Sequence, residues 1–389
     1  MVRQIGFRLV LLMTSLAIAL LAAEFALRLA LPIPDPYATT KEGRIAGFEN
    51  SFIRSQFAPD YTMTTLPEPG LPGVSGSKRF TVNNFGYRGP TLTVPKPKGE
   101  LRIFLVGGSS TECLYLDDSE SLDAVLQREL QTDSDCTVRV HNAGKSGDAS
   151  DDHVSMLVHR IVHLEPDLII VFAGLNDLGR AIYNHDYLHL DAVSQPNRPS
   201  PLLLLASEFQ VFRRMYYTFK RVAPSEKEIL EGVTQTTNYR KKVAVRQSYP
   251  ITDGPPRVDH DPYEANLRTL AGAARANGAR VVFLTQQTTW NSTVDPKAED
   301  WHWLTLLNGV RYREDELDRA LEGYNDVMRR VATQLDVPLL DLSASLVKSL
   351  DFFYDDVHFN VRGAQQTAQS LAQMLRDRGL CSCVSTEGR

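Results

Sequence analysis

Four short segments of the chain carry side chains that could together perform acyl transfer through a hydroxyl nucleophile. "VGGSST" (106–111) offers three hydroxyl residues, "HNAGKSGDAS" (141–150) offers glycines, "FAGLND" (172–177) offers an asparagine, and "FFYDDVHFN" (352–360) offers a histidine beside two aspartates. A hydroxyl nucleophile needs a base to take its proton, an acid to orient the base, and donors aimed at the developing oxyanion. The chain contains candidates for each role.

The elements that must position these segments follow from the hydrophobic pattern. Amphipathic stretches expected to be helices lie near residues 120–131, 150–163, 262–277 and 315–335, and again from 362, and they alternate with short apolar runs. This alternation indicates a parallel α/β sheet, whose right-handed crossovers bring the carboxyl ends of all strands to one edge. We therefore expect the four segments to meet at that edge. The predicted strands are 102–106, 137–141, 168–172, 280–284 and 337–341.

In this order, "GGSST", "NAGKSGDAS", "GLND" and "DDVH" resemble the four sequence blocks of the SGNH hydrolases, also called GDSL-like esterases and lipases. Each block alone is a common string, but the set is specific, and the resemblance covers about residues 99–380. It implies a three-layer α/β/α sandwich with a five-stranded parallel sheet in the order 2-1-3-4-5. It also implies hydrolysis of an oxygen ester, a reaction that requires no metal or organic cofactor.

The resemblance also implies a role for each matching residue. Ser109 matches the nucleophile, His358 the general base, and Asp355 the acid that orients the base. The backbone N–H groups of Ser109 and Gly147 and the side-chain amide of Asn176 match the oxyanion hole. The resemblance therefore places a Ser-His-Asp triad and its oxyanion donors at the expected edge of the sheet.

Two features of the chain leave alternatives to this assignment. Ser110 and Thr111 are hydroxyl residues as well, and the simpler interpretation of both is helix N-capping. "DYLH" gives a second D-x-x-H pair, Asp186 and His189, but it does not lie at a strand-to-helix junction. The first block also departs from the family, which often reads Gly-Asp-Ser, because Gly108 precedes the serine here. We expect that difference to affect only fine tuning beside the nucleophile.

Metal-binding and nucleic-acid-binding functions are disfavoured. His153, His159 and His163 fall on one predicted helix, but no HExxH motif or acidic ligand cluster accompanies them. The net charge of −5 gives no basic footprint for DNA or RNA. No CxxC pair suggests structural zinc, and the sequence leaves the disulfide state of the cysteines open. The cysteines are Cys113, Cys136, Cys381 and Cys383.

The amino terminus has the pattern of an export signal. Arg3 and Arg8 form a basic region, and "LVLLMTSLAIALLAA" (9–23) follows without a charge. No convincing small-x-small cleavage site precedes Glu24. We therefore predict that residues 1–34 are an uncleaved signal-anchor that crosses the cell membrane once and leaves the remainder outside the cytoplasm. A cleaved signal peptide is the alternative.

The remaining sequence divides by composition. Residues 35–98, rich in Pro, Gly, Ser and Thr, are expected to form an extracytoplasmic stalk or irregular extension, and 381–389 a C-terminal tail. An insertion at about 185–260 separates the third and fourth predicted strands of the hydrolase domain (99–380). Its segment "PLLLLASEFQVFRRMYYTFKRV" (201–222) is interpreted as a helix packed on the domain flank, or else as a lid or membrane-facing element.

The expected function is that of an exported serine esterase acting on an acylated glycan, a lipid or a small ester. Two alternatives remain: an O-acyltransferase that uses the same site on a polysaccharide, and a non-catalytic binding protein of the same fold. The loop after the fourth predicted strand is expected to contribute to the pocket wall. Its tryptophans could stack on sugar rings or pack in the protein; they are Trp290, Trp301 and Trp303.

Overall fold

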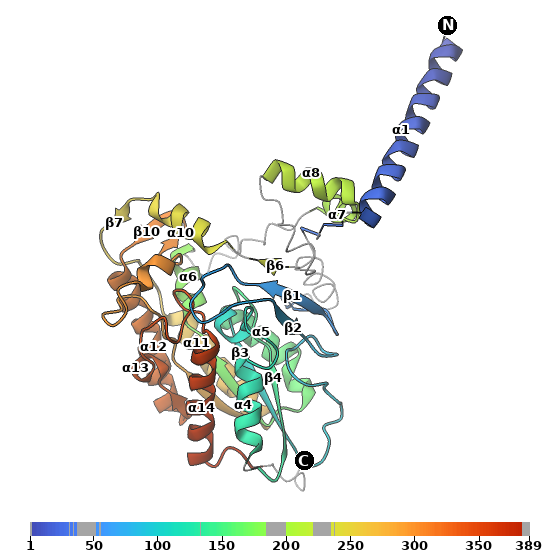
Figure 1. Ribbon diagram of the computed structural model, residues 1–389. Helices are drawn as coiled ribbons and strands as arrows, with labels where there is room; N and C mark the ends of the chain where they lie inside the picture. The colour runs from blue at the N-terminus through green and yellow to red at the C-terminus, as the bar shows by residue number, and fades with distance from the viewer. Residues whose placement is uncertain are drawn as a thin grey trace.

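Five parallel strands form the centre of the molecule (Figure 1). Their order is β4-β3-β5-β8-β11, which is the predicted order 2-1-3-4-5. The fifth strand is shorter than its predicted range, and the other four agree closely with theirs. The strand bounds are β3 (Glu100–Gly107), β4 (Thr137–Asn142), β5 (Leu168–Phe172), β8 (Arg280–Leu284) and β11 (Leu339–Leu340). The computed structural model describes residues 2–30, 32–33, 35–36, 52–53, 56–132, 134–183, 200–220, 235–236 and 238–382.

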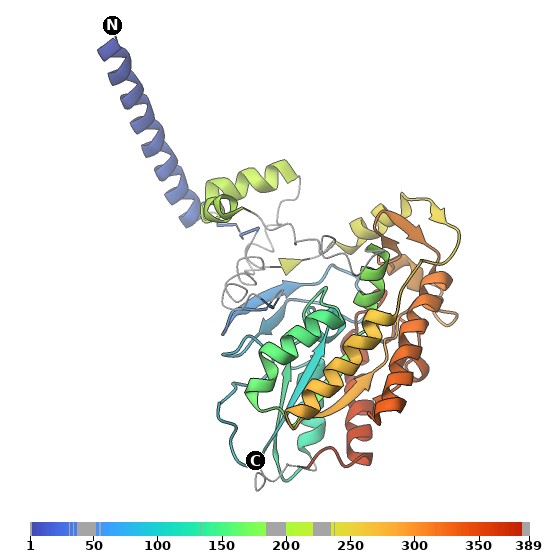
Figure 2. The same ribbon diagram turned by 180° about the vertical axis from the view of Figure 1, so that it is seen from behind.

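Helices cover both faces of this sheet, which is why its strands are continuous apolar runs (Figure 2). Successive side chains of a strand point to opposite faces. In β3, Phe104 and Val106 pack with one layer of helices, whereas Ile103 and Leu105 pack with the other. The first layer contains α5 (Ser150–His159), α11 (Asp261–Ala276) and α12 (Glu314–Leu335), and the second contains α4 (Leu122–Gln131) and α14 (Val361–Asp377). The architecture is the expected three-layer sandwich.

The described part of the segment before residue 99, predicted as a stalk or irregular extension, contains regular structure. It contributes the antiparallel strands β1 (Thr62–Leu66) and β2 (Lys78–Thr81), and Tyr87 and Leu92 belong to the same buried core as β3. The buried guanidinium of Arg88 donates to the backbone carbonyls of Glu112 and Cys113 at 3.0 and 2.8 Å. The described part of this extension is therefore folded onto the domain. These hydrogen bonds join segments that are remote in sequence, so composition alone does not reveal them.

The insertion contains several short elements. Its β6 (Gln235–Thr236) pairs with β1 and so joins the insertion to the extension. The two-residue β7 (Ile251–Thr252) pairs with β10 (Val310–Tyr312), which also pairs with β9 (Leu306–Leu307). The insertion helices are α7 (Pro201–Ala206), α8 (Gln210–Lys220) and α10 (Tyr239–Gln247).

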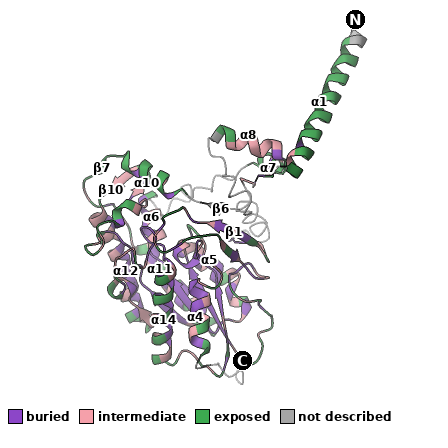
Figure 3. Cartoon of the chain, in the orientation of Figure 1, coloured by how far each residue is buried: buried purple, intermediate pink, exposed green. Residues whose placement is uncertain are grey.

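The amino-terminal helix α1 (Val2–Ala30) projects from the molecule, and its surface is exposed along most of its length (Figure 3). Within the described residues, it is the one helix that is long and apolar enough to cross a membrane. Helices α7 and α8 lie beside its carboxyl end (Figure 1). In both ribbon views α8 lies beyond β1 and β2, away from the central sheet (Figures 1 and 2).

The cysteines fall into two groups. Cys136 is disulfide-bonded, whereas Cys113 and Cys381 are free. Cys113 is buried, and this burial raises the pKa of its thiol to about 12. Cys383 and nearly all of the predicted tail lie outside the described residues.

Candidate active site

The carboxyl edge of the sheet brings the four predicted segments together. Ser109 begins the short helix α3 (Ser109–Glu112) immediately after β3, and Asn176 lies in the first turn of α6 (Leu175–Tyr183) immediately after β5. His358 lies just before α14, whose N-cap is Asn360. Each polar side chain is therefore held at the junction between a strand or loop and a following helix.

Ser109, His358 and Asp355 form a continuous hydrogen-bonded row. The Oγ of Ser109 lies 2.8 Å from Nε2 of His358. On the other side of the ring, Nδ1 lies 2.7 Å from Oδ2 and 2.9 Å from Oδ1 of Asp355. A carboxylate in this position holds the imidazole in the tautomer whose Nε2 can accept the hydroxyl proton.

The carboxylate of Asp355 is buried but well supplied with donors. Its Oδ1 accepts the backbone N–H groups of Val357 and His358 at 3.0 and 2.9 Å, and its Oδ2 accepts the indole N–H of Trp303 at 3.1 Å. Burial opposes ionisation, but the interaction with His358 and the backbone donors lower the pKa of Asp355 below its ordinary value. The group therefore stays ionised beside the imidazole at neutral pH.

The neighbouring aspartate, Asp356, has a different set of contacts. It accepts the indole N–H of Trp290 at 2.7 Å and the backbone N–H of Trp303 at 2.6 Å. Burial raises its pKa above the ordinary value. Asp356 therefore ties the loop after β8 to the loop that carries His358. The two adjacent aspartates are evident in the sequence, but no sequence pattern predicts that Asp356 binds the loop after β8.

Aromatic and cationic side chains enclose the imidazole and its aspartate. The ring of Tyr354 stacks on His358 with a centroid distance of 5.4 Å, and Lys242 from α10 lies 3.4 Å from the centroid of a Trp303 ring. Trp290 is fully buried and offers no face to a sugar, and Trp301 packs against the core. In this structure Trp290 and Trp303 support the loops around Asp355, a role that the sequence did not indicate.

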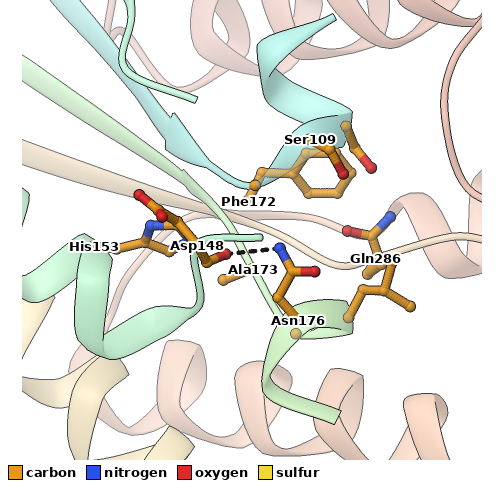
Figure 4. Close-up of a pocket in the computed structure, with 11 residues that line it drawn as sticks. Ser109, Asp148, His153, Phe172, Ala173, Asn176 and Gln286 are labelled. Carbon is orange, nitrogen blue, oxygen red and sulfur yellow. Dashed lines mark hydrogen bonds between the residues drawn. The ribbon is translucent and has the colours of Figure 1, made fainter. Parts of the chain in front are cut away.

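A small cavity of about 10 Å³, enough for about one water molecule, lies beside Ser109 (Figure 4). The amide of Asn176 points toward it, and its Nδ2 donates one hydrogen bond to the carbonyl of Asp148 at 2.7 Å. A primary amide carries two N–H groups, so the second stays available to a ligand. Gly147, with φ of +81°, is exposed next to Asp148 and is not part of the cavity wall.

The departure from Gly-Asp-Ser at Gly108 has a spatial explanation. A Cβ added to Gly108 would lie 2.4 Å from Nδ2 of Asn176 and 3.3 Å from the carbonyl of Asp148. A Cβ essentially never approaches another heavy atom so closely. Glycine at this position therefore allows Asn176 to approach the start of α3.

The alternative hydroxyl residues are placed differently from Ser109. Ser110 is buried, and its Oγ donates to the carbonyl of Val357 at 3.4 Å. Thr111 is fully buried, and its Oγ1 has no hydrogen-bond partner among the described residues. The expectation that these residues cap the helix is wrong, because the N-cap of α3 is Gly108 and no side chain caps it.

The histidines predicted to share one helix have separate surroundings in the structure. His153 lines the cavity beside Ser109, and burial lowers its pKa to about 4. His159 instead stacks on Phe52 with a centroid distance of 4.4 Å. Within the described ranges, no group of three His, Cys, Asp or Glu side chains could hold a metal ion. The pair Asp186 and His189 lies outside the described residues.

Comparison with known proteins identifies a family. A family model described as the GDSL-like lipase/acylhydrolase family matches residues 105–366. Axe2, an acetylxylan esterase from Geobacillus stearothermophilus, is 15% identical, with a TM-score of 0.40 over 72% of this chain and 94% of that one. LAE5, an alpha/beta hydrolase enzyme from the metagenome of Lake Arreo, Spain, is 16% identical, with a TM-score of 0.39 over 71% and 94%. No curated protein matches. At such low identities these structural likenesses say nothing about the substrate.

Proposed function

We propose that this chain, which belongs to the GDSL-like lipase/acylhydrolase family and is a hydrolase acting on ester bonds, is a serine esterase that uses Ser109, His358 and Asp355. The observation that carries the proposal is the unbroken row from the Ser109 hydroxyl through both ring nitrogens of His358 to the Asp355 carboxylate. A nucleophile, a base and an orienting acid within hydrogen-bond reach are what acyl transfer through serine requires.

In the proposed reaction, the Oγ of Ser109 attacks the ester carbonyl as Nε2 of His358 takes the hydroxyl proton. Asp355 stabilises the resulting imidazolium, which then gives the proton to the leaving alcohol as the ester C–O bond breaks. Water attacks the acyl-enzyme in the second half, with His358 again as base, and releases the acid and the free serine. His358 gives up each proton that it takes, and none of these steps needs a cofactor.

The oxyanion is proposed to accept hydrogen bonds from the second N–H of Asn176 and from the backbone N–H of Ser109, both beside the cavity; the backbone N–H of Gly147, which lies outside the cavity wall, is proposed as a third donor only on the family resemblance. Asp148 supports this role, because its backbone carbonyl accepts a hydrogen bond from one N–H of the Asn176 amide. This hydrogen bond fixes the plane of the amide and therefore the direction of its second N–H. Donors that are oriented before the reaction stabilise the developing charge without reorganisation.

Gly108→Ala is expected to lower kcat by about 10- to 100-fold, because the added methyl group would displace the amide of Asn176. Loss of one oxyanion donor costs roughly 10²- to 10³-fold, and displacement should cost somewhat less. Steady-state kinetics on a chromogenic ester measures the effect. Gly179→Ala in α6 is the matched control, since no atom of the described residues lies within 4 Å of its added methyl group. Equal activity of the two variants would contradict this role of Gly108.

The substrate is proposed to carry a short acyl group such as acetyl, because the cavity beside Ser109 is small. In a series of p-nitrophenyl esters, we expect kcat/KM to be highest for acetate and to fall by at least tenfold by octanoate. Acetylated glycans tested beside this series would show whether a sugar ester is hydrolysed. An added glycan acceptor tests the acyltransferase alternative, and we expect water to remain the main acceptor. A preference for octanoate would contradict the short acyl site.

The catalytic domain is proposed to lie outside the cytoplasm and to remain tethered by α1. The disulfide at Cys136 supports an oxidising compartment, and the length and exposure of α1 support a membrane anchor. Alkaline carbonate extraction of membranes should leave the full-length chain in the pellet. Release of a shortened protein with a new amino terminus near Glu24 would show that the signal is cleaved instead.

A further inference from the structure

Helix α8 is bound to the carboxyl end of α1, and α7 lies directly before α8 in the chain. Both oxygens of the Glu24 carboxylate accept backbone N–H groups from the first turn of α8, those of Gln210 and Val211, at 2.9 and 3.0 Å. The same carboxylate forms an ion pair with Arg28 at 2.7 Å. A negative charge at the amino end of a helix is favourable, because the unpaired N–H groups of the first turn point toward it.

A second set of contacts joins α8 to the chain that leaves α1. The side chain of Gln210 accepts the backbone N–H of Ile33 at 2.9 Å and donates to the carbonyl of the same residue at 3.3 Å. Arg213 donates to that carbonyl at 3.0 Å and lies 3.7 Å from the carboxylate of Asp35. The first turn of α8 is therefore bound to the carboxyl end of α1 and the chain that follows it, so the position of α1 sets the depth of α8.

The charges on α1 determine that depth in a membrane. At 1.5 Å per residue, the helix is about 43 Å long, which exceeds the roughly 30 Å hydrocarbon core of a bilayer. The uncharged stretch 9–23 is about 22 Å long at that rise, so the turn before it, with Arg8 snorkelling to the cytoplasmic surface, completes the span, and Glu24 and Arg28 come to the outer headgroup level. The beginning of α8, bound to Glu24, comes to the same level. In both ribbon views α8 leads away from the carboxyl end of α1 at a wide angle to it (Figures 1 and 2).

The surface of this helical pair is strongly apolar. Leu202 on α7 is 74% exposed and Phe219 on α8 is 81% exposed, and Leu205 and Met215 are exposed as well. Exposed apolar side chains gathered on one small element mark an interaction surface. On α8 the large apolar side chains recur at the spacing that puts them on one helical face. Those residues are Phe212, Met215, Tyr216 and Phe219.

We propose that α7 and α8 lie in the headgroup region of the membrane that α1 crosses, with their exposed apolar side chains in contact with lipid acyl chains. The inference rests on the proposed anchoring by α1. Lipid is the occupant that the geometry favours over a second protein copy, since the contacts of Glu24 and Gln210 hold the pair at the outer end of the membrane helix. An apolar face combined with aromatic side chains suits the interface.

The test uses the full chain in vesicles of phosphatidylcholine and phosphatidylglycerol. The photoreactive p-benzoylphenylalanine replaces one residue at a time: Leu205 on α7 or Phe219 on α8, with Leu12 on α1 and Val294 on the catalytic domain as controls. All four are exposed apolar positions, so the substitutions disturb packing little. After irradiation, mass spectrometry identifies the adducts. We expect lipid adducts at positions 12, 205 and 219, with at least tenfold less lipid adduct at 294.

The controls separate failure of this inference from failure of the anchor. Lipid adducts at Leu12 without adducts at Leu205 and Phe219 would overturn the inference and leave the anchor in place. Adducts between two protein copies at those positions would assign the surface to self-association instead. Absence of lipid adducts at Leu12 as well would overturn both the anchor and the inference. Esterase activity of each variant is measured separately and tests the site independently.

Discussion

Ser109→Ala is expected to abolish ester hydrolysis while leaving the fold intact. The change removes one oxygen from a half-buried position at the start of α3 and leaves no large cavity. It also removes the only hydroxyl that the described residues place at hydrogen-bond distance from Nε2 of His358. Loss of a serine nucleophile in a triad costs roughly six orders of magnitude in kcat. Steady-state hydrolysis of p-nitrophenyl acetate, with circular dichroism for the fold, is the measurement.

Ser110→Ala is the matched control, because it removes the same atom one residue further along the chain. Its Oγ donates to the carbonyl of Val357 instead of to the imidazole. We expect this variant to retain activity within a few-fold. If Ser110→Ala were inactive and Ser109→Ala active, the nucleophile would be the following residue and the assignment of the first block would be wrong.

His358→Ala is expected to cause the second large loss, of several orders of magnitude in kcat. Without the imidazole, the Ser109 hydroxyl has no described base within hydrogen-bond reach, and the buried carboxylate of Asp355 loses one of its hydrogen-bond partners. Asp355→Asn should retain roughly 10²-fold more activity than His358→Ala, since the aspartate orients the base and does not transfer the proton itself. The kcat values of the two variants on one ester are compared.

His189→Ala provides the control for the second D-x-x-H pair. We expect its turnover to stay within a few-fold of the unchanged chain, with any effect confined to KM. A large loss in His189→Ala together with near-normal turnover in His358→Ala would contradict the assignment of the base.

The central sheet could be predicted from the sequence because each of its strands is marked by a local pattern of apolar residues. Buried parallel strands require short apolar runs, and the alternation of those runs with amphipathic stretches fixes their topology. The same logic brought Ser109, Asn176 and His358 to one edge. Their positions follow from the strands that precede them in the chain. Such strands are the elements of an α/β chain that are predicted most reliably from the sequence.

The supports of the site could not be predicted in the same way. Arg88 lies in a stretch whose glycines and prolines are typical of a loop, yet its guanidinium binds the carbonyls at the end of α3. Trp303 reaches Asp355 across a long loop. These contacts depend on how separate loops pack, and neither has a periodic pattern. The position of α8 beside α1 has the same origin, since single polar contacts of Glu24 determine it.

Covalent capture of the nucleophile is the most direct test that Ser109 is the reactive serine. The unchanged protein is incubated with a fluorophosphonate probe, digested, and mapped by tandem mass spectrometry. We expect a single phosphonylated site at Ser109, with labelling that is lost when His358 is replaced and slowed when Asp355 is replaced, since the imidazole takes the proton and the aspartate orients it. Labelling at any other serine, or the absence of labelling in a protein that hydrolyses esters, would contradict this assignment.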